Sequence, residues 1–226
     1  MLIAEDIWVR HHRRSPWVLR GVTVRIEPGQ VLGLAGPSGV GKSTLATVLC
    51  GMRTPDHGIV TVDGTPLSSP SRPTRPARAG RGRPGPVQLV GQRPELMMDP
   101  RWRIGRILAE AGPAGLGEEA LVSPDWLERY PHELSSGELH RINLARAMRA
   151  RPAYLIADEI SSSLDALTQV QVWRDLLAWT ARDGLGVLAI SHDPDLLAAV
   201  ADTTVHLTPG DVRAPAERTV SGRRAG

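Results

Sequence analysis

Short runs of almost wholly apolar residues recur along the chain, and stretches with helical spacing follow them. The runs at 31–35, 154–157 and 187–190 predict buried strands. Apolar side chains that recur every three or four residues predict helices between these runs. The helices are expected after residue 42, with Leu45, Val48, Leu49 and Met52 on one face, and over 139–148, 170–180 and 194–200. This alternation predicts an α/β fold whose parallel sheet is covered on both faces.

Other segments follow different patterns. Apolar and polar residues alternate over 22–26, which predicts a half-exposed strand. The run 59–62 is followed by Asp63-Gly64, as in a strand that enters a hairpin turn. Residues 104–130 are expected to be mostly helical, with a Gly/Pro break at 112–117.

Two segments lack any such periodicity. Residues 66–86 contain six prolines and five arginines, which predicts a solvated loop or linker. The polar, Arg/Gly-rich residues 214–226 are expected to form a disordered tail. A single domain is therefore predicted over residues 1–213.

Composition narrows the possible functions. The chain has 226 residues and a single cysteine, Cys50, so it has no intramolecular disulfide and suits a reducing cytosol. No apolar run approaches the length of a membrane span. Basic and acidic residues nearly balance, for a net charge of +3, and no nucleic-acid partner is expected. Lys42 is the single lysine among 27 basic residues, which suggests that its chemistry does not tolerate arginine.

The segment around that lysine fits the phosphate-loop pattern G-x-x-x-x-G-K-[ST], between a buried strand and a helix. Its residues are Gly36, Pro37, Ser38, Gly39, Val40, Gly41, Lys42 and Ser43. Glycines allow the backbone N–H groups to turn toward a phosphate, and the helix N-terminus adds a positive dipole end. Lys42 is expected to reach the β- and γ-phosphates, Ser43 to ligate Mg²⁺ and Thr44 to bind near the α-phosphate.

An acid pair, Asp158-Glu159, follows the buried run 154–157. The carboxyl ends of parallel strands face the ligand in open α/β sheets. Asp158 is therefore expected to hold Mg²⁺ through water, and Glu159 to orient and activate the attacking water.

With these motifs the chain resembles the ATP-binding subunits of ABC transporters. Four further features occur in the family's order. They are Gln92, as in the Q-loop; Leu134-Ser135-Ser136-Gly137-Glu138, as in the LSGGQ signature; Ser163-Leu164-Asp165, as in the D-loop; and His192, as in the switch histidine. The resemblance implies a P-loop ABC ATPase fold with a parallel-sheet core, an antiparallel β subdomain and a small helical subdomain at about 95–150.

The resemblance also implies roles for these residues, with ATP and Mg²⁺ as cofactors. Two such domains dimerise head to tail, so that Ser135, Ser136 and Gly137 would bind the ATP held by the partner's phosphate loop. His192 would contact the γ-phosphate, Gln92 would sense Mg²⁺ and the attacking water, and Asp165 would couple the two sites. The adenine would stack on His11, which stands where the family commonly has Tyr, or on Trp17.

A narrower likeness concerns the importers of peptides and nickel. Gln92-Arg93-Pro94, Met98-Asp99-Pro100-Arg101 and Tyr130-Pro131-His132-Glu133-Leu134 are similar to motifs of that branch. The branch implies a peripheral subunit on the cytoplasmic face of the cell membrane, which powers import of peptides, nickel or a metal chelate. Its partners would be a second, nonidentical ATP-binding subunit, two membrane permease subunits and, indirectly, an extracytoplasmic substrate-binding protein.

Several departures from the family pattern are present. Ser136 and Glu138 replace a Gly and the Gln of the signature, Ser163 replaces an Ala, and Ile160 replaces a Pro. A carboxylate near a polyphosphate is unfavourable unless it points away or pairs with a basic group such as Arg141. These changes suggest a heterodimer in which the site completed by this signature is the weaker one.

Other functions stay open. The alternatives are a soluble ABC ATPase of DNA repair or regulation, an ABC exporter subunit, a P-loop nucleotide kinase and a nonhydrolysing regulatory subunit. DNA-repair members carry a long coiled coil or a zinc hook between the two halves of the domain. This chain has no heptad repeat for a coiled coil and a single cysteine, too few for a zinc hook. A nucleotide kinase would leave the signature-like segment unexplained.

Overall fold

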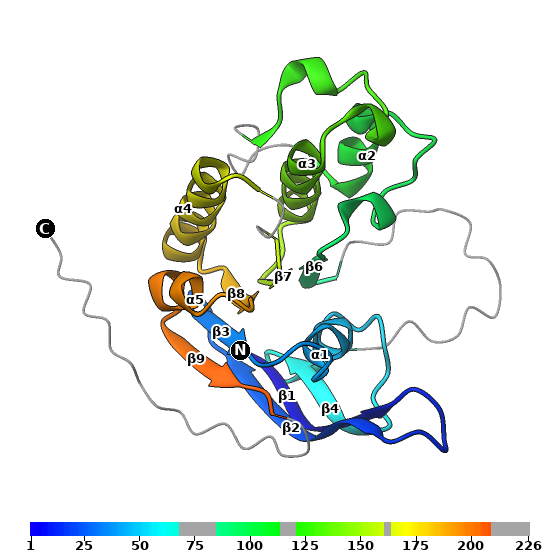
Figure 1. The fold of residues 1–226 in the computed structure, drawn as a ribbon, viewed down its shortest axis with the longest axis vertical. Helices are drawn as coiled ribbons and strands as arrows, with labels where there is room; N and C mark the ends of the chain where they lie inside the picture. The colour runs from blue at the N-terminus through cyan, green and yellow to red at the C-terminus, as the bar shows by residue number, and fades with distance from the viewer. Residues whose placement is uncertain (68–84, 114–120, 161–163, 209–226) are drawn as a thin grey trace, which may run out of the picture.

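The apolar runs form the centre of a parallel sheet in the computed structural model of the chain, which describes residues 1–67, 85–113, 121–160 and 164–208 (Figure 1). The sheet has five strands in the order β6-β7-β8-β3-β9. The strands are β3 (Val31–Ala35), β6 (Val87–Val90), β7 (Tyr154–Asp158), β8 (Gly186–Ile190) and β9 (Thr203–His206). All neighbouring pairs are parallel, so the carboxyl ends of the strands share one edge.

A second sheet is antiparallel and has the order β2-β1-β4-β5. Its strands are β1 (Leu2–Arg10), β2 (Trp17–Ile26), β4 (His57–Val62) and β5 (Thr65–Pro66). The pairing of β1 with β2 shifts register between Ala4 and Ile7 and again toward Arg10. Asp6 lies within this irregular stretch with a φ of 49°, which marks a bulge in the strand.

Within the described residues, five α-helices accompany the two sheets, and Figure 1 shows how they are arranged. They are α1 (Lys42–Leu49), α2 (Ile104–Ala111), α3 (Ser136–Arg149), α4 (Ala166–Asp183) and α5 (Pro194–Val200). Short 3₁₀ helices lie at η1 (Pro94–Leu96), η3 (Pro124–Trp126) and η4 (Pro131–Glu133). All of these elements lie in the part of the chain that the structure describes.

The alternation of side chains along β7 divides the core in two. Ile156 packs with α1 and the antiparallel sheet in one apolar cluster. Leu155 and Ala157 pack on the opposite face in a second cluster, with residues of α2, α3, α4 and α5. Because α1 packs with both sheets, the segment that precedes it is fixed from two sides.

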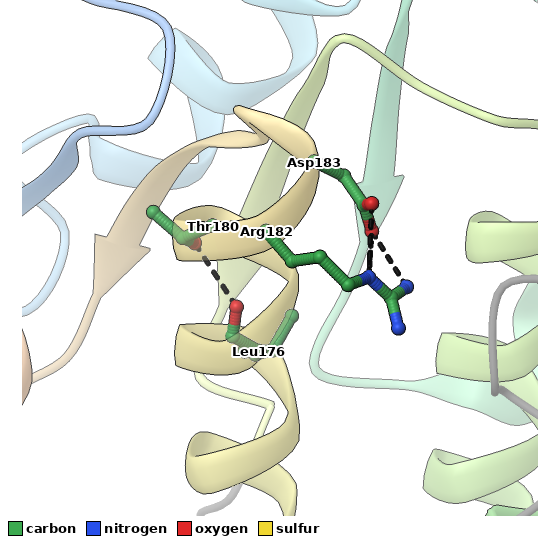
Figure 2. Close-up of polar contacts among 4 residues, drawn as sticks. All are labelled: Leu176, Thr180, Arg182 and Asp183. Atoms are coloured by element: carbon green, nitrogen blue, oxygen red, sulfur yellow. Dashed lines mark hydrogen bonds and ion pairs between the residues drawn. The ribbon is translucent and has the colours of Figure 1, made fainter.

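The long helix α4 ends in two different polar contacts (Figure 2). The Thr180 hydroxyl donates to the Leu176 carbonyl oxygen at 3.0 Å, which pairs a buried polar atom. Arg182 and Asp183 form an exposed ion pair at 2.7 Å. Gly184 then takes a φ of 69° at the C-cap, where a glycine carries no Cβ penalty.

The predicted α/β fold with a parallel sheet is confirmed, as are the helices and strands centred on the apolar runs. The placement of Met52 on the first helix was wrong, because α1 ends at Leu49 and Met52 is 60% exposed beyond it. Gly51, with a φ of 70°, turns the chain away before that residue. Strands β1, β6 and β9 were not predicted.

The prediction for 104–130 was confirmed up to the start of its Gly/Pro break and was wrong for residues 121–130. Helix α2 ends at Ala111, and Gly112 takes a φ of 141° that a helix cannot accommodate. In the described part of the remainder, residues 121–130, the clearest helical element is the single 3₁₀ turn η3. Pro124 at its start has no N–H to continue an α-helix from the preceding turn.

Some predictions concern residues outside the described ranges. Most of the Pro/Arg-rich segment 66–86, the tail 214–226 and Ser163 belong to this group. The proposed boundaries of the domain and of the helical subdomain stay predictions. Among the described residues, no helix is both long and apolar enough to cross a membrane.

Candidate nucleotide-binding site

The shared carboxyl edge of the parallel sheet opens into a cavity of about 690 Å³. It is lined by His11, Val18, Ser38, Gly39, Gly41, Lys42, Ser43, Thr44, Gln92, Glu159 and His192. The loop after β3, the glutamate after β7 and the histidine after β8 meet here because these three strands are adjacent and parallel. Sequence-predicted residues from five separate segments are thus brought together.

The loop between β3 and α1 has a backbone that requires glycine. Gly36, Gly39 and Gly41 have φ values of 146°, 77° and 112°. A Cβ on Gly36 would lie 2.5 Å from the Leu207 carbonyl oxygen, and one on Gly41 would lie 2.8 Å from Leu19 Cδ2. Because these neighbours lie so close, a side chain does not fit at either position, and the loop presents only its backbone there.

Helix α1 begins directly after this loop with an open N-terminus. Gly41 is its N-cap, and neither a side-chain cap nor an acidic residue is present in its first turn. The first N–H groups of a helix have no partner within the helix, and the dipole makes this end positive. This end of α1 is therefore suited to bind an anion.

Lys42 adds a cation beside the open helix end. Its side chain is 7% exposed, and its Nζ donates to the Gly36 carbonyl at 2.7 Å and to the Pro37 carbonyl at 3.0 Å. The buried ammonium is thus held by two neutral oxygens of the loop. An anion bound in the loop would therefore be attracted at close range by the positive charge of the Lys42 ammonium.

Asp158 lies buried at the end of β7. Burial raises the pKa of its carboxyl, and the charge of Glu159 raises it further, while the Ser43 hydroxyl and Lys42 act in the opposite direction. A bound cation would stabilise the ionised carboxylate of Asp158 in this buried position. The hydroxyl of Ser43 and the carboxylate of Asp158 are the oxygen donors that Mg²⁺ prefers, so the donor set fits that ion.

A conventional metal cluster is absent from the described ranges. Residues 1–67, 85–113, 121–160 and 164–208 contain no group of three or more His, Cys, Asp or Glu side chains that could hold a metal. A magnesium ion here would therefore need other ligands, such as water and phosphate oxygens, besides the protein. Mg²⁺ is commonly bound in this way, by one or two protein oxygens together with a phosphate.

Glu159 is fixed between two other predicted residues. Gln92 Nε2 donates to its Oε2 at 2.9 Å, and His192 Nδ1 lies 3.5 Å from its Oε1. Its backbone takes a φ of 53°, which is rare outside glycine, and its N–H donates to the Ile190 carbonyl at 3.0 Å. Backbone strain of this kind persists where surrounding structure enforces it, often at functional sites.

Two candidates for an aromatic contact lie at the outer end of the cavity. An adjoining cavity of about 720 Å³ is lined by both His11 and Trp17, and His11 lines the first cavity as well. The Trp17 ring is already in contact with other groups, edge-on to Trp8 with centroids 5.5 Å apart and 4.4 Å from the Arg10 guanidinium carbon. His11 is thus the better placed of the two.

The signature-like segment lies elsewhere. Ser135, Ser136 and Gly137 begin α3 and do not line the cavity just described. Asp165 is the N-cap of α4, where its carboxylate accepts from Leu167 N at 3.1 Å and Thr168 N at 3.0 Å. These residues are therefore separate from the phosphate loop within one chain.

Glu138 is hydrogen-bonded within its own helix turn and not to Arg141. Its carboxylate turns back and accepts from Ser135 N at 2.7 Å and Ser135 Oγ at 2.8 Å. These two bonds lower the pKa of Glu138. Arg141, the basic group proposed as its partner, has its guanidinium 4.7 Å from the Trp126 ring centroid.

Sequence reasoning missed several lining residues. Val18 lines both cavities, and it belongs to no motif. Gln169 and Trp173 of α4 line a smaller cavity of about 210 Å³ that also contacts Glu159 and His192. Helical periodicity could have assigned Trp173 to the buried face of α4, but nothing in the sequence connects it with the acid pair.

Comparison with known proteins agrees with this geometry. A family model described as "ABC transporter" matches residues 19–162. The nickel import ATP-binding protein NikE of Rhodospirillum rubrum is 34% identical over 215 residues, 88% of this chain and 76% of that protein. The putative oligopeptide transport ATP-binding protein YkfD of Bacillus subtilis is 33% identical over 84% of this chain and 61% of its own length.

Solved structures share the fold. The dimeric bacterial ABC transporter cassette MJ0796 superimposes with a TM-score of 0.76 at 21% identity, covering 96% of this chain and 99% of that one. A post-hydrolysis dimer of the same cassette, bound to ADP and Pi, gives the same score. The predicted P-loop ABC ATPase fold is confirmed. The chain belongs to the ATP-binding proteins of the ABC transporter family, which are ATPases.

Proposed function

We propose that the chain is the peripheral ATP-hydrolysing subunit of an ABC importer for peptides, nickel or a metal chelate, at the cytoplasmic face of the cell membrane. The single observation that carries the catalytic part is the convergence of Lys42, Ser43, Gln92, Glu159 and His192 on one cavity. The transport part is supported by the names of its relatives, which are nickel and oligopeptide transport ATP-binding proteins.

The nucleotide would bind with its phosphates in the loop from Gly36 to Ser43. The N-terminus of α1 and the Lys42 ammonium would neutralise the β- and γ-phosphates. Thr44, which lines the same cavity, would contact the region of the α-phosphate. His11 would stack on the adenine, since it lines both cavities.

Ser43 and Asp158 would hold Mg²⁺, with the side-chain carbonyl of Gln92 as a further ligand. The bound ion would neutralise charge on the phosphate oxygens during phosphoryl transfer. Gln92 already donates its amide nitrogen to Glu159. It therefore links the proposed metal position with the proposed general base.

Glu159 would orient the attacking water and accept its proton. The amide of Gln92 and the ring of His192 lie against the two carboxylate oxygens of Glu159 and would fix the direction from which the water attacks. His192 would also contact the γ-phosphate. Its side chain is 69% exposed, so it can reach a ligand in the cavity.

A second ATP-binding subunit would complete each site. Ser135, Ser136 and Gly137 are separate from the chain's own phosphate loop, which supports their use in the site of a partner. We infer a head-to-tail dimer with a nonidentical subunit, mounted on two permease subunits and supplied by an extracytoplasmic binding protein. Asp165, the cap of α4, would couple the two sites across the interface.

The test of the catalytic proposal is Glu159→Gln. We expect MgATP binding to persist and turnover to fall by about 10²–10⁴-fold, because a general base acts in the transition state. Phosphate release and binding of a fluorescent ATP analogue measure the two properties. Glu133→Gln, which removes an exposed carboxylate outside the cavity, is the matched control. Wild-type turnover in Glu159→Gln would remove this residue from the role.

The transport proposal needs the same variant in a membrane. The chain is co-purified with its second ATPase and candidate permease subunits and reconstituted in vesicles with a binding protein. Uptake of radiolabelled nickel or of a dipeptide should require MgATP and disappear with Glu159→Gln. If ATP hydrolysis persists but never depends on membrane subunits, the importer proposal fails and the ATPase proposal stands.

A further inference from the structure

The residue before the loop that carries His11 is held from several directions. Arg10 ends β1, and its backbone N–H donates to Asp56 Oδ2 at 3.0 Å. Its guanidinium Nε lies 3.7 Å from Asp56 Oδ1, and its carbonyl oxygen accepts from the Arg53 guanidinium at 2.8 Å. The backbone and the side chain of Arg10 are thus both fixed to the segment between α1 and β4.

The same guanidinium also contacts the loop itself and the strand that follows it. Its Nη1 donates to the Arg13 carbonyl oxygen at 2.8 Å. Its carbon lies 4.4 Å from the centroid of the Trp17 ring, at the start of β2, and that ring packs edge-on to Trp8 of β1. Arg10 therefore ties the loop, residues 11–16, to both strands that enter it.

The His11 side chain has no such anchor of its own. The residue is exposed, and within the described ranges no hydrogen bond, ion pair or ring contact involves its imidazole. Its place on both cavities therefore depends on the loop backbone. A group that is already ordered loses less conformational entropy when a ligand binds to it.

We propose that Arg10 is a positioning residue for the nucleobase. By holding the loop 11–16, it keeps the His11 imidazole where an adenine would stack. Arg10 lines neither cavity, so it acts through His11 and does not touch the nucleotide. The proposal rests on the proposed function, since it requires that His11 contacts the base.

A ligand without a base separates positioning from other effects. Tripolyphosphate offers the phosphate loop a polyanion like that of ATP, but it has no ring to stack on His11. Loss of the positive charge of Arg10, or general damage to the fold, would weaken the binding of both ligands. Loss of the position of His11 would weaken the binding of ATP alone.

The chain offers a matched control in another part of the molecule. Arg103 Nη1 donates to the Glu128 carboxylate at 2.9 Å and also to the Glu128 carbonyl oxygen. The Arg103 guanidinium carbon lies 5.3 Å from the centroid of the Tyr130 ring. Arg103→Ala therefore removes contacts with a carboxylate, a carbonyl and an aromatic ring, as Arg10→Ala does, from a place outside both cavities.

The experiment measures binding of the magnesium complexes of ATP and of tripolyphosphate by calorimetry, in a Glu159→Gln parent that prevents hydrolysis. We expect Arg10→Ala to weaken ATP binding about fivefold, because base stacking is partly lost, and tripolyphosphate binding less than about twofold. Arg103→Ala should change both less than about twofold. Arg10→Lys keeps a cation beside the Trp17 ring and should recover most of the ATP affinity.

A double variant tests whether Arg10 acts through His11. His11→Ala should itself weaken ATP binding, and Arg10→Ala added to it should cause no further loss, because the two residues act as one unit. Thermal unfolding without nucleotide checks that each variant folds. Where Arg10→Ala does not fold, Asp56→Asn replaces it, since its amide oxygen can still accept from Arg10 N while the charge is removed. ATP affinity should then fall about two- to threefold.

The outcomes separate the two proposals. Equal loss of ATP and tripolyphosphate affinity in Arg10→Ala, or no loss of either, overturns the positioning role, as does a further loss in the His11→Ala background or an equal loss of ATP affinity alone in Arg103→Ala. If His11→Ala leaves ATP affinity unchanged, the stacking role of His11 fails and that of Arg10 with it, while the phosphate site stands. Failure of the parent to bind either ligand overturns the proposed function itself.

Discussion

Two helix N-termini of the same molecule differ in whether a side chain caps them. Helix α1 begins at Gly41 with no side-chain cap and no acid in its first turn, and Lys42 lies beside it. Helix α3 begins at Ser135 with a side-chain cap, and Glu138 returns to the N-cap. Both ends carry the same backbone donors and the same dipole. They differ in whether the chain supplies its own negative charge.

This difference shows that a helix end is not a binding site by virtue of its backbone alone. At α1 the glycines keep side chains away, so an external phosphate is the natural partner of the donors. At α3 the Glu138 carboxylate already accepts a hydrogen bond from one backbone N–H group of the helix end. The comparison predicts that changes at α1 affect nucleotide binding directly, whereas changes at α3 affect stability and association.

The largest effect on nucleotide binding is expected from Lys42→Ala at the start of α1. The ammonium is buried beside the open helix end, so its loss should weaken ATP binding by about 10- to 100-fold, the usual value of hydrogen bonds to a charged group. Binding of a fluorescent ATP analogue measures the change. Arg25→Ala removes an exposed positive charge from β2 and should bind normally. Equal affinity in both variants would contradict the assignment of the loop.

A smaller effect is expected from Gly41→Ala. The φ of 112° is unfavourable for alanine, and the new Cβ would lie 2.8 Å from Leu19 Cδ2. We expect the free energy of unfolding to fall by about 2 kcal/mol, measured by urea denaturation. Gly64→Ala has a φ of 75° and no atom within 4 Å, so it should lose less. If the two variants were equally stable, crowding at Gly41 would play no part.

Sequence reasoning predicted the residues around the uncapped N-terminus of α1 well and those around the capped N-terminus of α3 poorly. Lys42, Gln92, Glu159 and His192 come together because the carboxyl ends of parallel strands share an edge. Spacing after the apolar runs was sufficient for Lys42 and Glu159, whereas Gln92 and His192 were assigned through the resemblance to the ABC family. The strand order and the bulged β1 depend on contacts between distant segments, which periodicity does not contain. Strand β1 was missed because its register shifts interrupt the alternation.

The orientation of Glu138 could have been predicted from local spacing. Ser135 and Glu138 stand three residues apart, as in the S-x-x-E capping box, and this signal was not used. The prediction instead considered repulsion between the Glu138 carboxylate and a polyphosphate, and an ion pair of Glu138 with Arg141. The end of α2 at Ala111 agrees with the break expected at 112–117, but the helix expected beyond the break is replaced in residues 121–130 by the short turn η3, which begins at Pro124.

The smallest predicted effect is the pH dependence of the closed helix end. The hydrogen bonds from Ser135 lower the pKa of Glu138 below its ordinary value of 4.5, so the carboxylate stabilises the folded state above that pH. This contribution should be lost as the pH falls through the lowered pKa. Glu138→Gln cannot titrate, so the difference in unfolding free energy between wild type and variant should shrink from about 0.5 kcal/mol at pH 6 toward zero at low pH. Urea denaturation at several pH values measures it. A difference that stays constant with pH would mean that the carboxylate of Glu138 does not close this helix end.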